Sequence, residues 1–246
     1  MSKVINMVFA KSRSTGLPRF TYTGQYSFIQ DGDGHWRIKF LTSGTLTFSS
    51  LGNGADGADL FIVGGGGGSN TYAGGGGGYT VTLSNITLET GTSYSIVVGD
   101  GGSGASGYNQ AASGESSSAF GNSVSGGSGA NSLSGGSGGS GGSGYGRDNP
   151  GDADGGSNGG NGQSPDGGNG VGQGSTTREF AENGGDLYSG GGAGLSYDGD
   201  DPVTSQGGLG GGGDSGQSGT ANTGGGAGNG NHSGGSGIVV IRDHRV

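Results

Sequence analysis

Apolar and polar residues alternate with a period of two over much of residues 20–100. Successive side chains of a strand point to opposite faces, so this period is typical of half-buried β-strands. Turn-forming segments rich in glycine, aspartate and threonine separate the alternating runs, as expected between antiparallel neighbours. The pattern predicts an all-β fold, an antiparallel β-sandwich, with alternating runs at 36–40, 46–48, 79–83 and 94–98.

Two other runs, Leu60–Val63 and Ile238–Ile241, are apolar at every position. Such a run is expected where a strand is covered on both of its faces. Ile238 lies 175 residues after Val63, yet four consecutive branched apolar residues are strongly favoured to leave water. We therefore predict that the second run returns to the sandwich. The chain between the two runs would then be an insertion held at both ends.

Glycine dominates this insertion. The chain contains 71 glycines in 246 residues, about 29%, whereas ordinary proteins contain roughly 7%. A helical fold is excluded because each interior glycine costs about 1 kcal/mol relative to alanine. Collagen is excluded because there are only 4 prolines and glycine does not recur at every third position. Composition leaves a flexible linker as one interpretation, and the segment Gly135–Gly144 looks like one.

The ordered alternative is a bundle of polyglycine II helices. A polyproline II helix has three residues per turn and no internal hydrogen bonds, so its backbone groups point outward. Where most residues are glycine, such helices can approach closely enough to bond to one another. A structureless loop of this length is also uncommon inside a compact domain. The blocks that suit this packing are 64–68, 74–78, 190–194, 207–213 and 224–230.

These patterns divide the chain into four segments. Residues 1–19 form a candidate N-terminal attachment segment, and residues 20–100 supply the strands of the sandwich. Residues 101–237 form the glycine-rich polyglycine II region, and residues 238–246 carry the C-terminal strand that returns to the sandwich. The predicted fold is thus an antiparallel β-sandwich with a large inserted glycine-rich bundle.

The net charge and the sequence motifs argue against several classes of function. The net charge is −9, and six of the ten lysines and arginines lie in the first 40 residues, so binding of a nucleic-acid backbone is not expected. No apolar run approaches the roughly 20 residues of a spanning helix, so membrane insertion is not expected either. Gly-x-Ser-x-Gly occurs only where glycine and serine are abundant, without the strand and helix of a nucleophile elbow. We predict no enzyme, no cofactor and no transition-metal site.

Polar and aromatic residues interrupt the glycine blocks. Tyrosine and asparagine at such positions offer contact area and adaptable hydrogen bonds, as in antibody loops. If the blocks are helices, the interruptions lie at their ends, and those at one end should form one surface. Solvated turns and a calcium site built from Asp148, Asp152 and Asp154 or from Asp198, Asp200 and Asp201 remain alternatives. The candidate binding residues are Tyr108, Asn109, Tyr145, Arg147, Asp148, Asn149, Tyr197, Asp198, Asp200, Asp201, Asn231 and His232.

Several motifs resemble the glycine-rich domain of bacteriophage and prophage tail proteins. They include Leu60-Phe-Ile-Val-Gly-Gly-Gly-Gly-Gly68, Tyr94-Ser-Ile-Val-Val-Gly99 and, most specifically, Gly234-Gly-Ser-Gly-Ile-Val-Val-Ile-Arg242. The glycine blocks alone are more distantly similar to the receptor-binding adhesin at the tail-fibre tip of T-even phages. That likeness implies stacked polyglycine II helices whose end loops touch the host surface.

The resemblance implies a non-enzymatic virion protein on a phage tail or fibre. Its expected partners are a bacterial cell-surface receptor, protein or polysaccharide, and other tail or fibre proteins, with a homo-oligomer as a further possibility. A structural decoration module without a receptor and an ice-binding protein are the alternatives. The candidate residues for docking to the virion are Val4, Ile5, Val8 and Phe9.

Overall fold

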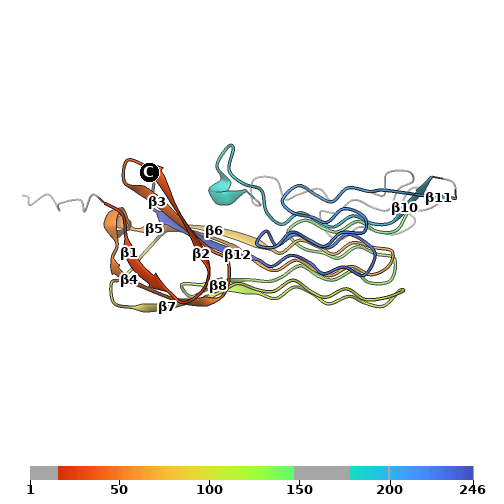
Figure 1. The fold of residues 1–246 in the computed structure, drawn as a ribbon, viewed down its shortest axis with the longest axis horizontal. Helices are drawn as coiled ribbons and strands as arrows, with labels where there is room; N and C mark the ends of the chain where they lie inside the picture. The colour runs from red at the N-terminus through yellow and green to blue at the C-terminus, as the bar shows by residue number, and fades with distance from the viewer. Residues whose placement is uncertain (1–15, 147–177, 199, 246) are drawn as a thin grey trace, which may run out of the picture.

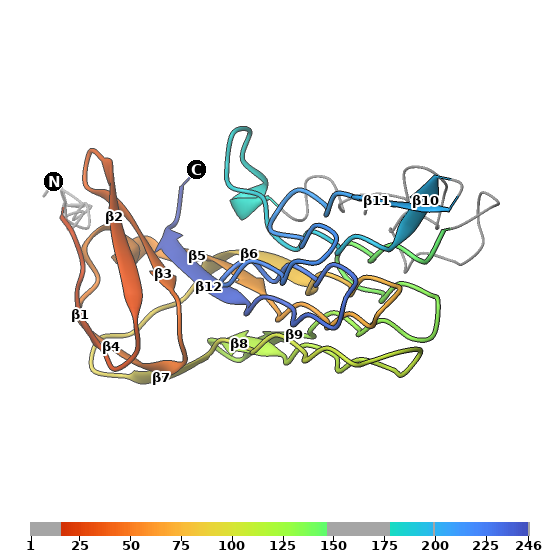
Figure 2. The ribbon, with the colours of Figure 1, turned by 45° about the vertical axis from the view of Figure 1, so that its right-hand side comes forward.

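The computed structural model of the protein describes residues 16–146, 178–198 and 200–245. The molecule is elongated. A β-sandwich lies at one end, and glycine-rich segments extend from it side by side along the long axis (Figures 1 and 2). The described residues contain no α-helix, only strands and two short 3-10 helices, η1 (Gly52–Asp56) and η3 (Glu179–Ala181).

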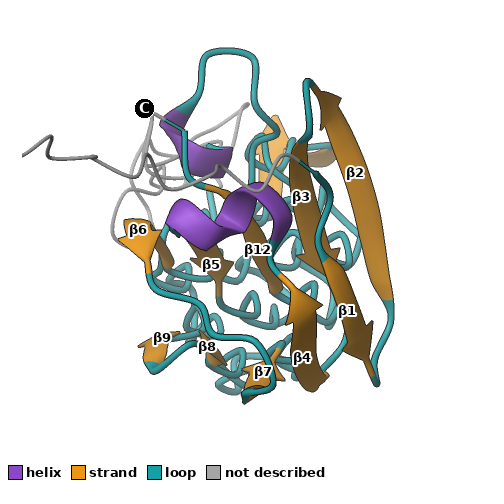
Figure 3. Ribbon diagram, turned by 90° about the vertical axis from the view of Figure 1, so that its left-hand side faces the viewer, coloured by secondary structure: helices purple, strands orange, loops and turns teal. Residues whose placement is uncertain are grey.

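Two five-stranded antiparallel sheets form the sandwich (Figure 3). In spatial order, the first sheet contains β1 (Arg19–Tyr22), β4 (Gly44–Ser50), β7 (Ser93–Val97), β8 (Ser117–Ala119) and β9 (Asn122–Val124). The second contains β2 (Tyr26–Gly32), β3 (His35–Phe40), β12 (Ile238–Asp243), β5 (Ala58–Val63) and β6 (Thr80–Ile86). A separate hairpin pairs β10 (Ser196–Asp198) with β11 (Asp201–Val203).

The return of the C-terminal strand is confirmed. β12 lies in the middle of the second sheet, between β3 and β5, and Ile238 pairs with Val63. All six residues of β5 and all six of β12 are buried. The strands at the two ends of the glycine-rich insertion are therefore neighbours in one sheet.

The inner faces of the two sheets make one hydrophobic core. Trp36, Ile38 and Phe40 point into it from β3 and are fully buried, as their alternation predicts. They pack against residues of the opposite sheet and of the neighbouring strands, namely Leu46, Phe48, Leu60, Ile62, Ile96, Val239 and Ile241. Burial of this apolar surface is the main source of stability of the sandwich.

A segment of the insertion covers the outer face of the second sheet. Residues 178–188, here called the strap, place Phe180 and Tyr188 against Phe61 and form a second core. The Glu179 carboxylate accepts hydrogen bonds from the Arg37 guanidinium and the Tyr188 hydroxyl and lies 2.7 Å from the Lys39 ammonium. The outward-pointing Arg37 and Lys39 side chains of β3 are therefore paired with a carboxylate rather than left in water. Residues 101–237 therefore contribute the strap, β8 and β9 to the sandwich, besides the bundle.

Backbone hydrogen bonds in the glycine-rich segments follow a period of three. In segment 64–69, every third N–H group donates to the same neighbouring segment, and the three neighbours run antiparallel to it. Because three residues make one turn of polyglycine II, this period is the one expected of that helix. The donors and acceptor segments are Gly64 and Gly67 with 74–79, Gly65 and Gly68 with 111–116, and Gly66 and Ser69 with 231–236.

Carbonyl groups of the same segment accept from three other neighbours, which run parallel to it: 99–105, 125–130 and 223–230. Segment 64–69 is therefore surrounded by six others, in which all six of its N–H groups and the carbonyl groups of residues 65–69 have hydrogen-bond partners. The segment Gly135–Gly144 has the composition of a flexible linker, but its backbone is hydrogen-bonded to Gly74 and Gly77. Two of its N–H groups donate to their carbonyl groups, and two of its carbonyl groups accept from their N–H groups. The predicted polyglycine II bundle is confirmed.

Close backbone approach explains why these positions are glycine. A Cβ atom on Gly66 would lie 2.0 Å from the carbonyl oxygen of Gly225, and one on Gly67 would lie 2.0 Å from that of Ser128. Both distances are far below van der Waals contact. Any side chain on the inward rows would push two helices apart and break the hydrogen bonds between them.

The buried carboxylate of Asp59 on β5 is bonded to both neighbouring strands, β12 and β6. Asp59 accepts hydrogen bonds from the Arg242 Nε–H (3.2 Å) and the Asn85 N–H (3.1 Å), and its Oδ1 lies 2.6 Å from the His244 Nδ1. Burial acts to raise the pKa of Asp59, but the hydrogen bonds with His244, Asn85 and Arg242 outweigh it and lower the pKa below 3.8. Folding therefore favours the ionised form.

We predict that Gly66→Ala destabilises the whole protein by about 3 kcal/mol, the upper part of the range for overpacking. The added methyl group would collide with Gly225 and separate central helices of the bundle. Urea unfolding followed by circular dichroism measures the effect. Gly16→Ala is the matched control, since a Cβ there meets nothing within 4 Å. Equal stability of the two variants would contradict the close packing described above.

We also predict that the stabilising effect of Asp59 disappears in acid. Its lowered pKa gives stability that is present above pH 3.8 and is lost as the pH falls through the folded-state value. Asp59→Asn should cost about 3 kcal/mol at pH 7, and the difference from the native protein should shrink below about pH 4. Urea unfolding at a series of pH values tests this. Asp33→Asn, at an exposed turn position with φ of 49°, is the control and should change little at any pH.

Candidate functional site at the distal tip

Turns between glycine-rich segments meet at the end of the bundle that points away from the sandwich. Figures 1 and 2 show the β10–β11 hairpin at this end. Each turn reverses the direction of the chain, so successive turns lie at opposite ends of the bundle. We define the distal tip as residues 69–73, 106–109, 131–134, 145–146, 195–198, 200–203 and 229–232.

Four tyrosines from different turns form a chain of ring contacts in the distal tip. Tyr72 stacks on Tyr108, with ring centroids 4.5 Å apart and an interplanar angle of 18°. Tyr145 meets Tyr72 edge-on at 5.6 Å, and Tyr197 meets Tyr145 edge-on at 6.1 Å. Tyr108 remains 59% exposed, and the other three are half-buried. The rings therefore present a partly open aromatic surface.

Asn70 holds the turns in place. Its side chain is fully buried, and its amide nitrogen donates to the Ser132 carbonyl at 2.6 Å. Its amide oxygen accepts from the backbone N–H groups of Tyr72 (2.9 Å) and Ala73 (2.8 Å). Asparagine is suited to this role because it both donates and accepts. One residue thereby positions the Tyr72 turn against the neighbouring turn.

The turn after residue 228 is joined to the same place. The Thr71 hydroxyl donates to the Asn231 side-chain oxygen at 3.2 Å and accepts from the Gly107 N–H at 2.9 Å. The backbone of His232 bonds to Ser69, both to its N–H and to its hydroxyl. Three turns that are far apart in the sequence are therefore fixed relative to one another.

The Tyr72 hydroxyl is in its neutral form at physiological pH. The hydrogen bond with Tyr108 and the proximity of that hydroxyl raise the pKa of Tyr72 above 10.0. A neutral hydroxyl both donates and accepts hydrogen bonds. The tip therefore offers aromatic faces together with polar groups that can adapt to a partner.

Much of the predicted binding set meets in this tip. Tyr145 lies beside the β10–β11 hairpin because the Gly146 N–H donates to the Leu195 carbonyl at 3.0 Å. The predicted residues brought to the distal tip are Tyr108, Asn109, Tyr145, Tyr197, Asp198, Asp200, Asp201, Asn231 and His232. Those outside the described residues are Arg147, Asp148, Asn149, Val4, Ile5, Val8 and Phe9, as are Asp152 and Asp154 of the calcium alternative.

Two tip residues, Asn70 and Tyr72, were not among the candidates. Both residues interrupt two glycine blocks, 64–68 and 74–78, which is the same sequence signal that identifies the predicted binding residues. Because the chain up to residue 100 reads as sandwich strands, this interruption looks like a turn between strands. The structure places it at the opposite end of the molecule.

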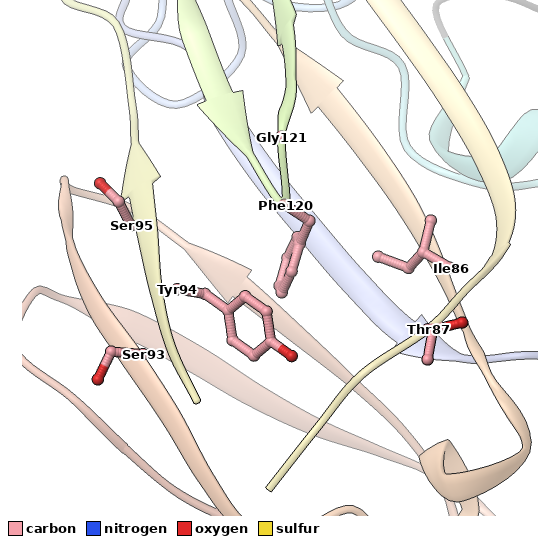
Figure 4. A pocket seen from close by; sticks show the side chains of 7 residues that line it. All are labelled: Ile86, Thr87, Ser93, Tyr94, Ser95, Phe120 and Gly121. Atoms are coloured by element: carbon pink, nitrogen blue, oxygen red, sulfur yellow. The ribbon is translucent and has the colours of Figure 1, made fainter. Parts of the chain in front are cut away.

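A hollow lies on the side of the sandwich, between β6 and β7, with a volume of about 570 Å³. Figure 4 shows Ile86, Tyr94 and Phe120 pointing into it, while Ser93 and Ser95 point away. The rings of Tyr94 and Phe120 are 4.9 Å apart, and the Tyr94 hydroxyl accepts a hydrogen bond from the Glu89 N–H. The hollow is chiefly apolar, and no predicted site residue lines it.

In the part of the chain that the structure describes, no group of three or more His, Asp or Glu side chains is placed to hold a metal ion. No helix among the described residues has the length and apolar character needed to cross a membrane.

Comparison with known proteins gives one match. No curated protein and no solved structure matches the chain. Residues 42–243 match the family described as glycine-rich domain, a range that begins just after β3 and ends with β12. The match thus spans most of the sandwich and the whole bundle. Since it covers well over half of the sequence, this chain belongs to the glycine-rich domain family.

Proposed function

We propose that this protein is a non-enzymatic bacteriophage virion protein, carried on a tail or tail fibre, whose distal tip binds a receptor on the bacterial surface. The observation that carries the proposal is the meeting of four tyrosines from separate turns at one end of a rigid bundle. The motifs shared with glycine-rich domains of phage tail proteins support the assignment to a virion.

The chemistry of the tip suits binding. Tyrosine supplies a large contact area for few rotatable bonds, and it is enriched among the residues that dominate binding energy. The supporting hydrogen bonds of Asn70 and Thr71 are made before any partner arrives, so little ordering is required on association. A preorganised aromatic surface of this kind favours adhesion over catalysis.

The layout of the molecule also suits an adhesin. The first strand, β1, and the last, β12, both belong to the sandwich, so the described chain begins and ends at the end opposite the tip (Figure 2). The sandwich is then the part available for contact with other tail or fibre proteins. The tip projects outward by the length of the bundle.

A structural module without a receptor is the second candidate. The specific observation in its favour is the strap, which ties the insertion to the sandwich through buried ion pairs and serves rigidity rather than recognition. It predicts that the isolated protein does not bind host cells.

We predict that Tyr108→Ala weakens binding of the purified protein to host cells by about thirtyfold, the effect of a binding hot spot of about 2 kcal/mol. The substitution removes the most exposed ring of the tyrosine chain and its stacking on Tyr72. Fluorescently labelled protein and flow cytometry over the candidate host strains measure the affinity.

Tyr79→Ala is the matched control, because Tyr79 is 39% exposed but has no ring contact with the tip tyrosines. It should bind cells like the native protein. Circular dichroism should show that both variants are folded. Unchanged binding of the folded Tyr108 variant would exclude the tip as the receptor-binding surface, and binding of the native protein to no cell would favour the structural module.

A further inference from the structure

A smaller hollow, here called the junction hollow, lies where the sandwich meets the bundle and has a volume of about 330 Å³. Its wall comes from the turn before β2, the connection from β3 to β4, the end of β7 and two segments of the bundle, around Glu115 and Asn222. Hydrogen bonds fix these segments: the Glu115 N–H donates to the Asp100 carbonyl at 2.8 Å, and the Val98 N–H donates to the Ser43 hydroxyl at 2.9 Å. The volume falls within the range of small-molecule sites.

The junction hollow is lined by polar side chains that have hydrogen-bonding capacity to spare. Among the described residues, no hydrogen bond or ion pair engages the side chains of Gln25, Asp100 or Glu115. The side-chain nitrogen of Asn222 is also without a partner there, although its oxygen accepts from a serine hydroxyl. Carboxylates only accept hydrogen bonds, whereas carboxamides both donate and accept. The hollow can therefore satisfy several polar groups of one ligand.

Exposed hydroxyls cover the outer face of the first sheet beside this hollow. In the pairing of β4 with β7, Thr45 lies opposite Ser95 and Thr47 lies opposite Ser93. β1 extends the second of these rows with Thr21, which lies opposite Thr47. Figure 4 shows Ser93 and Ser95 pointing away from the interior of the sandwich. We call these five residues the hydroxyl face.

The hydroxyl face is uncharged and continuous with the junction hollow. Exposed protein surfaces normally carry many charged side chains, which keep the protein soluble. Here the outward positions of β1, β4 and β7 carry one, Arg19, at the start of β1. Val97, which is 38% exposed, lies two residues after Ser95 on the same face and also lines the hollow. The two features therefore form one surface.

The chemistry of this surface matches an uncharged sugar. Each sugar hydroxyl both donates and accepts, so it can bond to carboxylates, carboxamides and protein hydroxyls alike, and the bonds to carboxylates are the stronger ones. The C–H groups of a sugar ring can contact the aliphatic part of the wall, Leu41 and Val97. An acidic sugar would meet like charge at Asp100 and Glu115, which costs affinity. An ammonium group would suit these carboxylates but would give no role to the rows of hydroxyls.

We infer that the junction hollow binds one unit of a neutral polysaccharide and that the hydroxyl face contacts the units that follow. This site lies on the sandwich side of the bundle and uses no residue of the distal tip. The inference therefore does not depend on receptor binding by the tip.

The first test applies the labelled full chain to an array of neutral, acidic and amino oligosaccharides of one to six units. The protein should bind neutral oligosaccharides, and the signal should rise with chain length as more units reach the hydroxyl face. Binding should change little with salt, because no ion pair is formed. Preference for acidic or amino sugars, or binding to no member of the array, would overturn the inference.

Gln25→Ala should weaken binding of the neutral oligosaccharide with the strongest array signal about fivefold, as expected for the loss of one hydrogen bond. Isothermal titration calorimetry measures the affinity. The matched control is Gln217→Ala, since Gln217 is also exposed but lies outside the hollow. Equal affinity of the Gln25 variant and the native protein would exclude the junction hollow as the site.

Ser95→Lys places a long charged side chain on the hydroxyl face and should abolish the gain in affinity with oligosaccharide length. Ser84→Lys is the control, because Ser84 is an exposed serine of β6 in the other sheet. Circular dichroism verifies that each variant is folded. An unchanged length dependence in the Ser95 variant would refute the role of the hydroxyl face.

Tyr108→Ala separates this site from the distal tip. This variant should bind the oligosaccharide like the native protein, even if it no longer binds host cells. If it lost oligosaccharide binding as well, the sugar site would belong to the tip and the inference would be overturned.

Discussion

Hydrogen bonding between main chains that lie too close for any Cβ atom is the constraint on which this molecule depends. Polyglycine II has no internal hydrogen bonds, so each helix must find all of its partners on its neighbours. Segment 64–69 does so with six of them. Ordering so many glycines has a high conformational cost, and only a bundle in which the bonds form together can offset it. Glycine is here the material of the scaffold rather than a source of flexibility.

Side chains are consequently displaced to the two ends of the bundle. At one end the apolar residues collect into the sandwich, whose strands continue directly into the glycine-rich segments, as β5 does into Gly64. At the other end the turns carry tyrosine and aspartate, which the packing of the helices does not require, and the buried Asn70, which fixes the turns relative to one another. Variation in the turns is therefore compatible with an unchanged scaffold. The antibody domain separates framework and recognition in a comparable way.

The features that could be predicted are those with a local signal. The period of two in 36–40 and the apolar run 238–241 identify strands, and the glycine blocks identify helices whose packing excludes side chains. The strap could not be predicted, because Glu179 meets Arg37 across 142 residues and nothing near either residue marks the other. Likewise, the sequence locates each turn but not the end of the bundle at which it lies. That depends on the register of all the helices, which places Asn70 and Tyr72 beside Tyr145.

The central position of β12 determines the order in which the protein can fold. β3 and β5, which flank β12 in the sheet, are made early in synthesis, but the strand that belongs between them emerges only after the whole bundle has been translated. Until then the second sheet has a gap at its centre, and its two halves expose unpaired edges that are prone to misassociation. Native contacts of such long range slow folding. The nascent chain is therefore expected to need protection from association until β12 has been synthesised and paired.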